Sequence, residues 1–169
     1  MTGVLPAERL LTIDTPRTAA DVHAVVALAR RMHAEGAYAF LPFDATKVAA
    51  SVVASAALAD RYAAIAVRGG VIVGFLGGAL TTYPFCNERL AHDVGFYVAP
   101  EARASSAAVR LIQAFRAWAV EQGAREVSLG VSSGVEVDRI ERLYTRLGFR
   151  RMGGVYRERL GAAADSQGG

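Results

Sequence analysis

Two adjacent glycines, Gly69 and Gly70, join two β-rich runs and constrain the fold more than any other feature of this sequence. A two-residue glycine linker between such runs is typical of the tight turn of a β-hairpin. The flanking residues 62–68 and 71–81 are therefore predicted to pair as antiparallel strands. Segments with helical patterning lie on both sides of this hairpin, so the sequence predicts an α/β (α+β) fold.

Capping residues and hydrophobic periodicity place the other elements. Thr18, with Asp21 three residues later, resembles a capping box, and Asp44 is predicted to cap a second helix. Pro100 stops a strand, and an amphipathic helix follows it. The segments predicted besides the hairpin are helices at 18–32, 45–59 and 139–147, the helix after Pro100, strands at 10–13, 91–98 and 126–131, and extended pieces at 149–155 and 156–160.

Composition indicates one domain that stays in the cytoplasm. The chain has 169 residues, of which 53% are hydrophobic, and no apolar run is long enough to cross a bilayer. Glu8, Arg9 and Asp14 interrupt any signal-peptide pattern, so secretion is not expected. A lone cysteine, Cys86, excludes an internal disulfide and gives no zinc-site spacing. We expect a single domain over residues 1–160 and a flexible tail over 161–169.

The charge pattern favours a small phosphorylated ligand over a nucleic acid. The net charge is +3, and every basic residue except Lys47 and the histidines is an arginine. Arginine forks match phosphate oxygens. These arginines alternate with acidic residues and form no basic stripe, so the sequence gives no support to nucleic-acid binding.

The junction at residues 98–108 has the features of an anion site. A strand ends at Val98, and a helix opens after five small residues in succession, Ala104 to Ala108. Small residues let backbone N–H groups approach an anion, and a helix start concentrates unpaired N–H groups. This pattern suits a diphosphate, although the same residues also suit the plain start of an alanine-rich helix.

Three further residues suggest a catalytic slot. Gly95 and Gly130 lie inside predicted strands, where glycine marks a bulge, a ligand against the backbone, or room for a large neighbour. Tyr144 lies near the end of the predicted helix at 139–147. Its hydroxyl can donate a proton to a leaving thiolate, although most buried tyrosines are core residues with one satisfied hydrogen bond.

These motifs together resemble the GNAT superfamily of acyl-CoA-dependent N-acyltransferases. The resemblance rests on Val-x-Pro-x-x-Arg ending at Arg103 and on Leu-Tyr-x-x-Leu-Gly-Phe around Tyr144. The family pattern of Gln or Arg, two residues, Gly, one residue, and Gly or Ala departs at Ser106, and Val137 replaces a frequent asparagine. The resemblance implies a mixed, mostly antiparallel sheet of six to seven strands, about four flanking helices, and splayed fourth and fifth strands.

The resemblance also implies an activity. An acetyl group would pass from acetyl-CoA directly to a primary amine without a covalent intermediate or a metal, and Tyr144 would protonate the CoA thiolate. A homodimer through edge strands is a further implication. The residues expected to bind the cosubstrate are Phe96, Tyr97, Val98, Arg103, Ala104, Ser105, Ser106, Ala107 and Ala108.

The acceptor half of the site is less determined. Asp93 matches the position of the carboxylate base that many relatives carry, and His92 beside it faces the other side of the strand. Cys86 has no evident activating partner as a nucleophile. Glu35, Tyr38 and Tyr83 are the expected acceptor contacts, although the aromatic residues there also suit a cover for the core end.

A second hypothesis keeps the fold but not the chemistry. The departures at Ser106 and Val137 suit a GNAT-like binding or regulatory module with weak or lost CoA-dependent catalysis. Calorimetry with CoA separates the two hypotheses.

Overall fold

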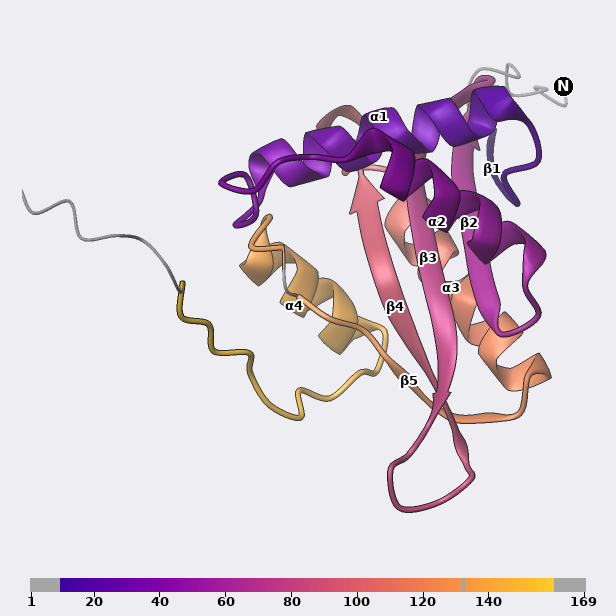
Figure 1. Cartoon of the computed structure of the whole chain (residues 1–169), viewed down its shortest axis with the longest axis vertical. Helices are drawn as coiled ribbons and strands as arrows, with labels where there is room; N and C mark the ends of the chain where they lie inside the picture. Colours follow the sequence, from indigo (N-terminus) through magenta and orange to yellow (C-terminus); the bar gives the residue numbers. More distant parts are fainter. Residues whose placement is uncertain (1–9, 132, 160–169) are drawn as a thin grey trace, which may run out of the picture.

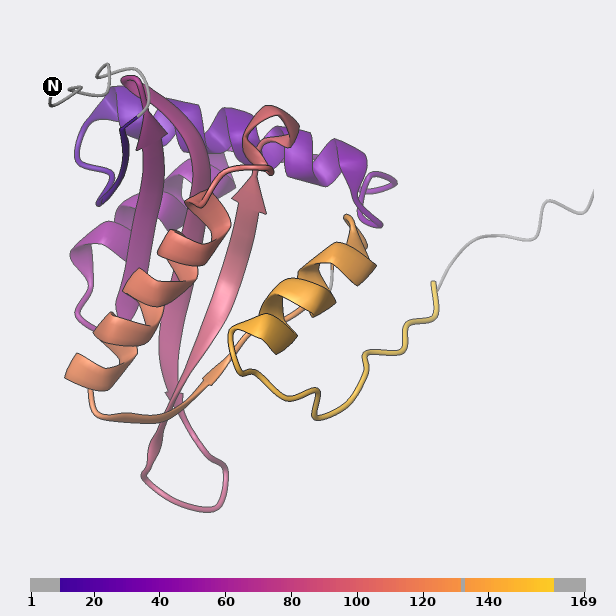
Figure 2. The same ribbon diagram turned by 180° about the vertical axis from the view of Figure 1, so that it is seen from behind.

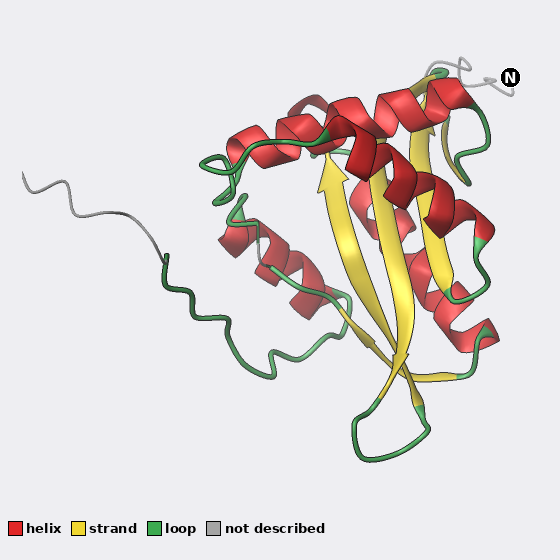
Figure 3. Ribbon diagram, viewed as in Figure 1, coloured by secondary structure: helices red, strands yellow, loops and turns green. Residues whose placement is uncertain are grey.

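A computed structural model describes residues 10–131 and 133–159. Four helices in this part of the chain flank one central sheet, as Figures 1 and 3 show. No helix within the described residues is long and apolar enough to span a membrane. The elements are β1 (Leu11–Asp14), α1 (Ala19–Glu35), α2 (Ala45–Ala57), β2 (Arg61–Arg68), β3 (Val71–Thr82), β4 (Arg89–Val98), a 3₁₀ turn (Pro100–Ala102), α3 (Ala107–Glu121), β5 (Ala124–Ser128) and α4 (Val137–Arg146).

Local signals in the sequence correctly located the starts of α1 and α2 and the hairpin. Thr18 Oγ1 accepts from Asp21 N at 3.1 Å, and the Asp21 carboxylate accepts from Thr18 N at 2.8 Å, which completes the capping box. Asp44 Oδ1 accepts from Lys47 N at 3.0 Å at the start of α2. Gly69 and Gly70 have φ values of 57° and 77°, as the tight turn between β2 and β3 requires.

The predicted number of strands is wrong. The sheet of the described residues has five strands in the order β1-β2-β3-β4-β5, and residues 149–159 form none. Gly153 and Gly154 interrupt the β-forming residues there, and the side chains of Met152 and Tyr156 are 86% and 98% exposed rather than packed on a sheet. The predicted tail at 161–169 lies outside the described residues.

A bulge and a fork in the sheet create the space for a site. β4 is antiparallel to β3, with Gly77 opposite Gly95 and Gly78 opposite Asp93, so Val94 is an extra residue in β4. β5 is parallel to β4 but pairs only with residues 89–92. The edge of β4 that faces β5 is therefore unpaired along residues 93–98, which agrees with the expected splay.

The two faces of the sheet have separate cores. α1 and α2 cover one face in Figure 1, and α3 covers the other, seen from behind in Figure 2. The α3 side is built around Phe115, Leu111 and Ile112, all fully buried against β2 and β3. The α1 side joins Val25 and Leu28 with side chains of β2, β3 and β4.

Gly78 is predicted to be intolerant of any side chain. A Cβ there would lie 2.8 Å from Cζ of the fully buried Phe115 and still closer to its Cε2. Gly78→Ala should therefore lower the free energy of unfolding by about 1–3 kcal/mol, measured by urea denaturation. Gly77→Ala is the matched control, since its Cβ would meet nothing nearer than 3.9 Å. Equal stabilities of the two variants would contradict this packing argument.

Candidate active site

The fork opens into a large cleft. Its volume is about 740 Å³, and it lies between α1 and α2 on one side and the diverging ends of β4 and β5 with α4 on the other. Most of its wall is apolar, which suits a small-molecule site with a few polar groups. The residues that carry the chemistry discussed below are Asp93, Val94, Gly95 and Phe96 of β4, Gly130 and Ser133 after β5, Ile140 and Tyr144 of α4, and Met32, His33, Tyr38, Phe43 and Lys47 of the helical side.

The backbone of Gly130 connects the two predicted catalytic side chains. Asp93 Oδ1 accepts a hydrogen bond from Gly130 N at 2.7 Å, and the Tyr144 hydroxyl donates one to Gly130 O at 3.3 Å. The structure therefore brings Asp93 and Tyr144 together at one residue at the base of the fork. His92, the alternative to Asp93, does not line the cleft.

Burial shifts the proton affinities of both groups. It raises the pKa of Asp93 above the ordinary value of 3.8, although the hydrogen bond from Gly130 opposes this shift. Burial, and then the charge of Asp93, raise the pKa of Tyr144 well above 10.0. At neutral pH the tyrosine is therefore protonated and able to donate, while Asp93 is a stronger base than an exposed aspartate.

A second cavity of about 310 Å³ lies beside the 98–108 junction. It is lined by Ala104, Ser105 and Ala108, and also by Arg139 and Arg146 of α4. Among the described residues, the backbone N–H groups of Ala104 and Ala108 have no hydrogen-bond acceptor. Free N–H groups with arginines around them suit an anionic group. The predicted residues Phe96, Tyr97, Val98 and Arg103 also line this cavity.

Ser106 and Ala107 lie differently from the other predicted residues of this loop. Neither lines the second cavity. Ala107 is fully buried, and its N–H donates to Ser105 Oγ at 3.2 Å. Ser106 is exposed, and its side chain does not cap α3.

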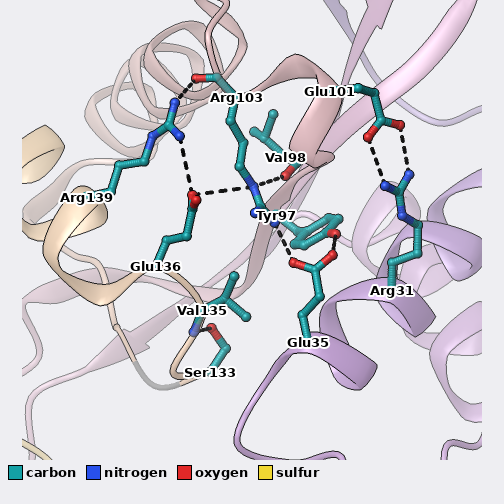
Figure 4. A network of polar contacts seen from close by, with 10 residues as sticks. All are labelled: Arg31, Glu35, Tyr97, Val98, Glu101, Arg103, Ser133, Val135, Glu136 and Arg139. Carbon is teal, nitrogen blue, oxygen red and sulfur yellow. Dashed lines mark hydrogen bonds and ion pairs between the residues drawn. The ribbon is translucent and has the colours of Figure 1, made fainter.

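The guanidinium of Arg103 forms hydrogen bonds with other residues of this chain (Figure 4). Nε donates to Val98 O at 3.0 Å, and Nη2 donates to Glu35 Oε2 at 2.6 Å. The Tyr97 hydroxyl donates to the other oxygen of Glu35. Burial alone would raise the pKa of Glu35, but the hydrogen bonds from Tyr97 and Arg103 outweigh it and hold this pKa below 4.5. Arg103 thus links the ends of α1 and β4.

Only one of the three predicted acceptor contacts lies on the cleft. Tyr38 lines it, whereas Glu35 belongs to the Arg103 network and does not. Tyr83 lies in the loop between β3 and β4, at the far end of these strands from the fork in Figure 1, and its hydroxyl donates to Glu126 at 2.5 Å.

Sequence reasoning missed Lys47 as a cleft residue, and it gave His33 no role of its own within the segment expected to contact the acceptor. Both line the helical side, and His33 Nε2 is a buried nitrogen without a hydrogen-bond partner among the described residues. A polar residue in the last turn of α1, and another in the first turn of α2, were signals that a helical-wheel comparison could have found.

Comparison with known proteins agrees with this architecture. The sequence profile of the acetyltransferase (GNAT) family matches residues 24–149. No curated protein matches significantly. Aminoglycoside N-acetyltransferase AAC(6')-Iy in complex with CoA superimposes with a TM-score of 0.72 at 19% identity, covering 92% of this chain and 98% of that chain.

Two further solved structures are similar. AAC(6')-Iy bound to the bisubstrate analogue CoA-S-monomethyl-acetylneamine gives a TM-score of 0.70 at 20% identity, with coverage of 89% and 99%. The ribosomal-protein-alanine N-acetyltransferase of Brucella melitensis biovar Abortus 2308 gives 0.67 at 19% identity, with coverage of 88% and 98%. These likenesses establish the fold. The profile match covers most of the sequence and establishes the family. The chain belongs to the acetyltransferase (GNAT) family, which confirms both the resemblance and the acyltransferase class expected from its sequence.

Proposed function

We propose that this protein transfers an acetyl group from acetyl-CoA directly to a primary amine. The observation that carries the proposal is the adjacency of the two cavities, which share the lining residues Phe96, Ser133 and Ile140. A cosubstrate with its diphosphate at the free N–H groups of the 104–108 loop would extend its thioester past these residues to Gly130. The AAC(6')-Iy structures in complex with CoA and with a CoA-linked analogue support this choice of donor.

The residues present fit the donor along its length. The free N–H groups of Ala104 and Ala108, with Arg139 and Arg146, would hold the diphosphate. The unpaired edge of β4 from residue 93 onward offers backbone groups to the amides of the pantetheine arm. The side chain of Arg103 is already bonded to Val98 O and Glu35, so we assign it to holding the loop.

The proposed chemistry uses Asp93 and Tyr144, the two side chains that form hydrogen bonds with Gly130. The Asp93 carboxylate takes a proton from the ammonium of the acceptor, and the free amine attacks the thioester carbonyl. As the C–N bond forms, the C–S bond breaks, and the Tyr144 hydroxyl gives its proton to the CoA sulfur. The nitrogen of the new amide then loses its second proton, which restores the Tyr144 hydroxyl. Both groups lie on the same cleft, so one acceptor pose serves both steps.

The cleft also limits the acceptor class. Its helical side combines apolar side chains such as Met32 and Phe43 with the polar groups of His33, Tyr38 and Lys47. We therefore propose an acceptor amine with an apolar body that contacts Tyr38.

Donor binding provides the direct test. Acetyl-CoA at 100 times its dissociation constant should stabilise the fold by about 2.7 kcal/mol, which corresponds to roughly 5–10 °C in melting temperature for a domain of this size. Ala108→Glu should remove this protection, because it places a carboxylate beside the free N–H groups. Ala117→Glu, exposed on the same helix, is the matched control and should keep it.

The same measurement separates the two hypotheses. Protection by acetyl-CoA with release of free CoA in the presence of amines supports the enzyme. Protection without turnover on any amine would support the binding module. An absence of protection in the wild type, or full protection of Ala108→Glu, would contradict the assigned donor site.

A further inference from the structure

Glu136 lines the second cavity, and its carboxylate points toward Arg103 and Arg139 in Figure 4. Its Oε2 is 3.6 Å from Nε of Arg103 and 3.6 Å from Nη1 of Arg139. Glu136 is the residue before α4, yet its side chain does not cap that helix. The carboxylate is therefore held by these two arginines, and not by its own backbone.

Two arginines that converge on one oxygen form the arrangement that proteins use for phosphate. Glu136 and the free N–H groups of Ala104 and Ala108 border the same 310 Å³ space. A diphosphate bound there would lie close to this carboxylate, and like charges at such short range repel. The donor and Glu136 thus compete for Arg139.

The contacts of Glu136 are the weakest in the network. Arg103 donates hydrogen bonds to Val98 O at 3.0 Å and to Glu35 at 2.6 Å. Arg139 Nη2 donates one to Arg103 O at 2.5 Å. The two contacts of Glu136, both at 3.6 Å, are ion pairs beyond hydrogen-bond range. Nη1 of Arg139 can therefore exchange Glu136 for a phosphate while Nη2 keeps its hydrogen bond to Arg103 O.

We propose that Glu136 tunes the affinity for the acyl donor by weakening the hold on donors that carry phosphates. Its carboxylate occupies part of the anion position, and a donor gains Arg139 only by displacing it. A diphosphate does so through its higher charge, whereas a short pantetheine thioester without phosphates gains nothing from the exchange. Glu136 also weakens the hold on CoA, which favours release of this product. This inference rests on the function proposed above.

Glu136→Gln tests the inference, because it keeps the shape and removes the charge. The variant should bind CoA about two- to fivefold more tightly than the wild type by calorimetry, as expected for loss of a partly exposed competing charge. Affinity for S-acetylpantetheine, which lacks phosphates, should not change. The gain in CoA affinity should shrink as salt is raised, because screening weakens the repulsion between the Glu136 carboxylate and the diphosphate.

Glu141→Gln is the matched control on the same helix. Glu141 also makes a 3.6 Å ion pair, with Arg151, and its side chain is 41% exposed against 38% for Glu136, but it does not line the second cavity. This control should bind CoA as the wild type does. Within an Arg139→Gln background, the gain in CoA affinity from Glu136→Gln should be smaller, since the cation for which Glu136 and the diphosphate compete is gone.

The outcomes are distinguishable. If the wild type binds CoA but Glu136→Gln binds it no more tightly, or gains equally for S-acetylpantetheine or in high salt, the role of Glu136 is overturned and the proposed function stands. If neither protein binds CoA, the proposed function and this inference are both overturned. Melting curves of each variant establish that the fold is retained.

Discussion

Replacing Tyr144 by phenylalanine is expected to lower the turnover number about a hundredfold or more, because it removes the proton donor to the CoA thiolate. The phenylalanine ring keeps the packing against Phe149, so the buried site retains its shape. Only the hydroxyl and its 3.3 Å hydrogen bond to Gly130 O are lost. Steady-state assays of CoA release should show this fall in kcat, while calorimetry shows an acetyl-CoA affinity within about twofold of the wild type.

Tyr62→Phe is the matched control for this prediction. Tyr62 is also partly buried and packs on Phe115 and Trp118, but it lines neither cavity. This variant should keep the wild-type kcat. If Tyr144→Phe also turned over at the wild-type rate, Tyr144 would be a core residue and another group or water would protonate the thiolate.

Short-range signals allowed the framework of this site to be predicted from the sequence. The capping box at Thr18, the Gly69-Gly70 hairpin and the position of the 98–108 junction each depend on residues within a few positions of one another. Such signals act through local backbone geometry and hydrogen bonds, so they can be read without knowledge of distant contacts.

The roles of individual side chains depended on contacts that sequence cannot show. Glu35 was expected at the acceptor, but it lies next to Tyr97 and Arg103, which are 62 and 68 residues away in the chain. Tyr83 likewise meets Glu126, 43 residues away. A charged or aromatic residue bonds to whichever partner the fold presents, and no periodicity in the sequence encodes that partner.

The bulge in β4 shows an intermediate case. Gly95 indicated either a bulge or room for a neighbour, and the register places the extra residue at Val94. This bulge changes the alternation of side chains along the strand, so inward and outward positions cannot be counted through it. The prediction of extended pieces at 149–155 and 156–160 was wrong for a related reason. High β-propensity alone does not form a strand unless a neighbouring strand pairs with it and buries it.

Asp93 is expected to set the acid limb of the pH–rate profile. A general base works only when deprotonated, and burial raises the pKa of Asp93 above 3.8. The kcat/KM of the wild type should therefore fall as pH drops through this raised pKa. Asp93→Asn should lower kcat/KM about 10²- to 10⁴-fold near neutral pH and remove this limb. Asparagine can still accept the hydrogen bond from Gly130 N, so the fork should keep its geometry.

The pH dependence of the melting temperature tests the ionisation of Asp93 independently of activity. Because the folded pKa is raised, protonated Asp93 contributes stability that is fully present below 3.8 and is lost as pH rises through the folded pKa. The asparagine variant cannot ionise, so its melting temperature relative to the wild type should increase across that pH window. His92→Asn, a change at the adjacent residue outside the cleft, should keep an acid limb, which moves to higher pH because the charge of His92 lowers the pKa of Asp93. An acid limb that persists in Asp93→Asn and disappears in His92→Asn would transfer the role of base to the histidine.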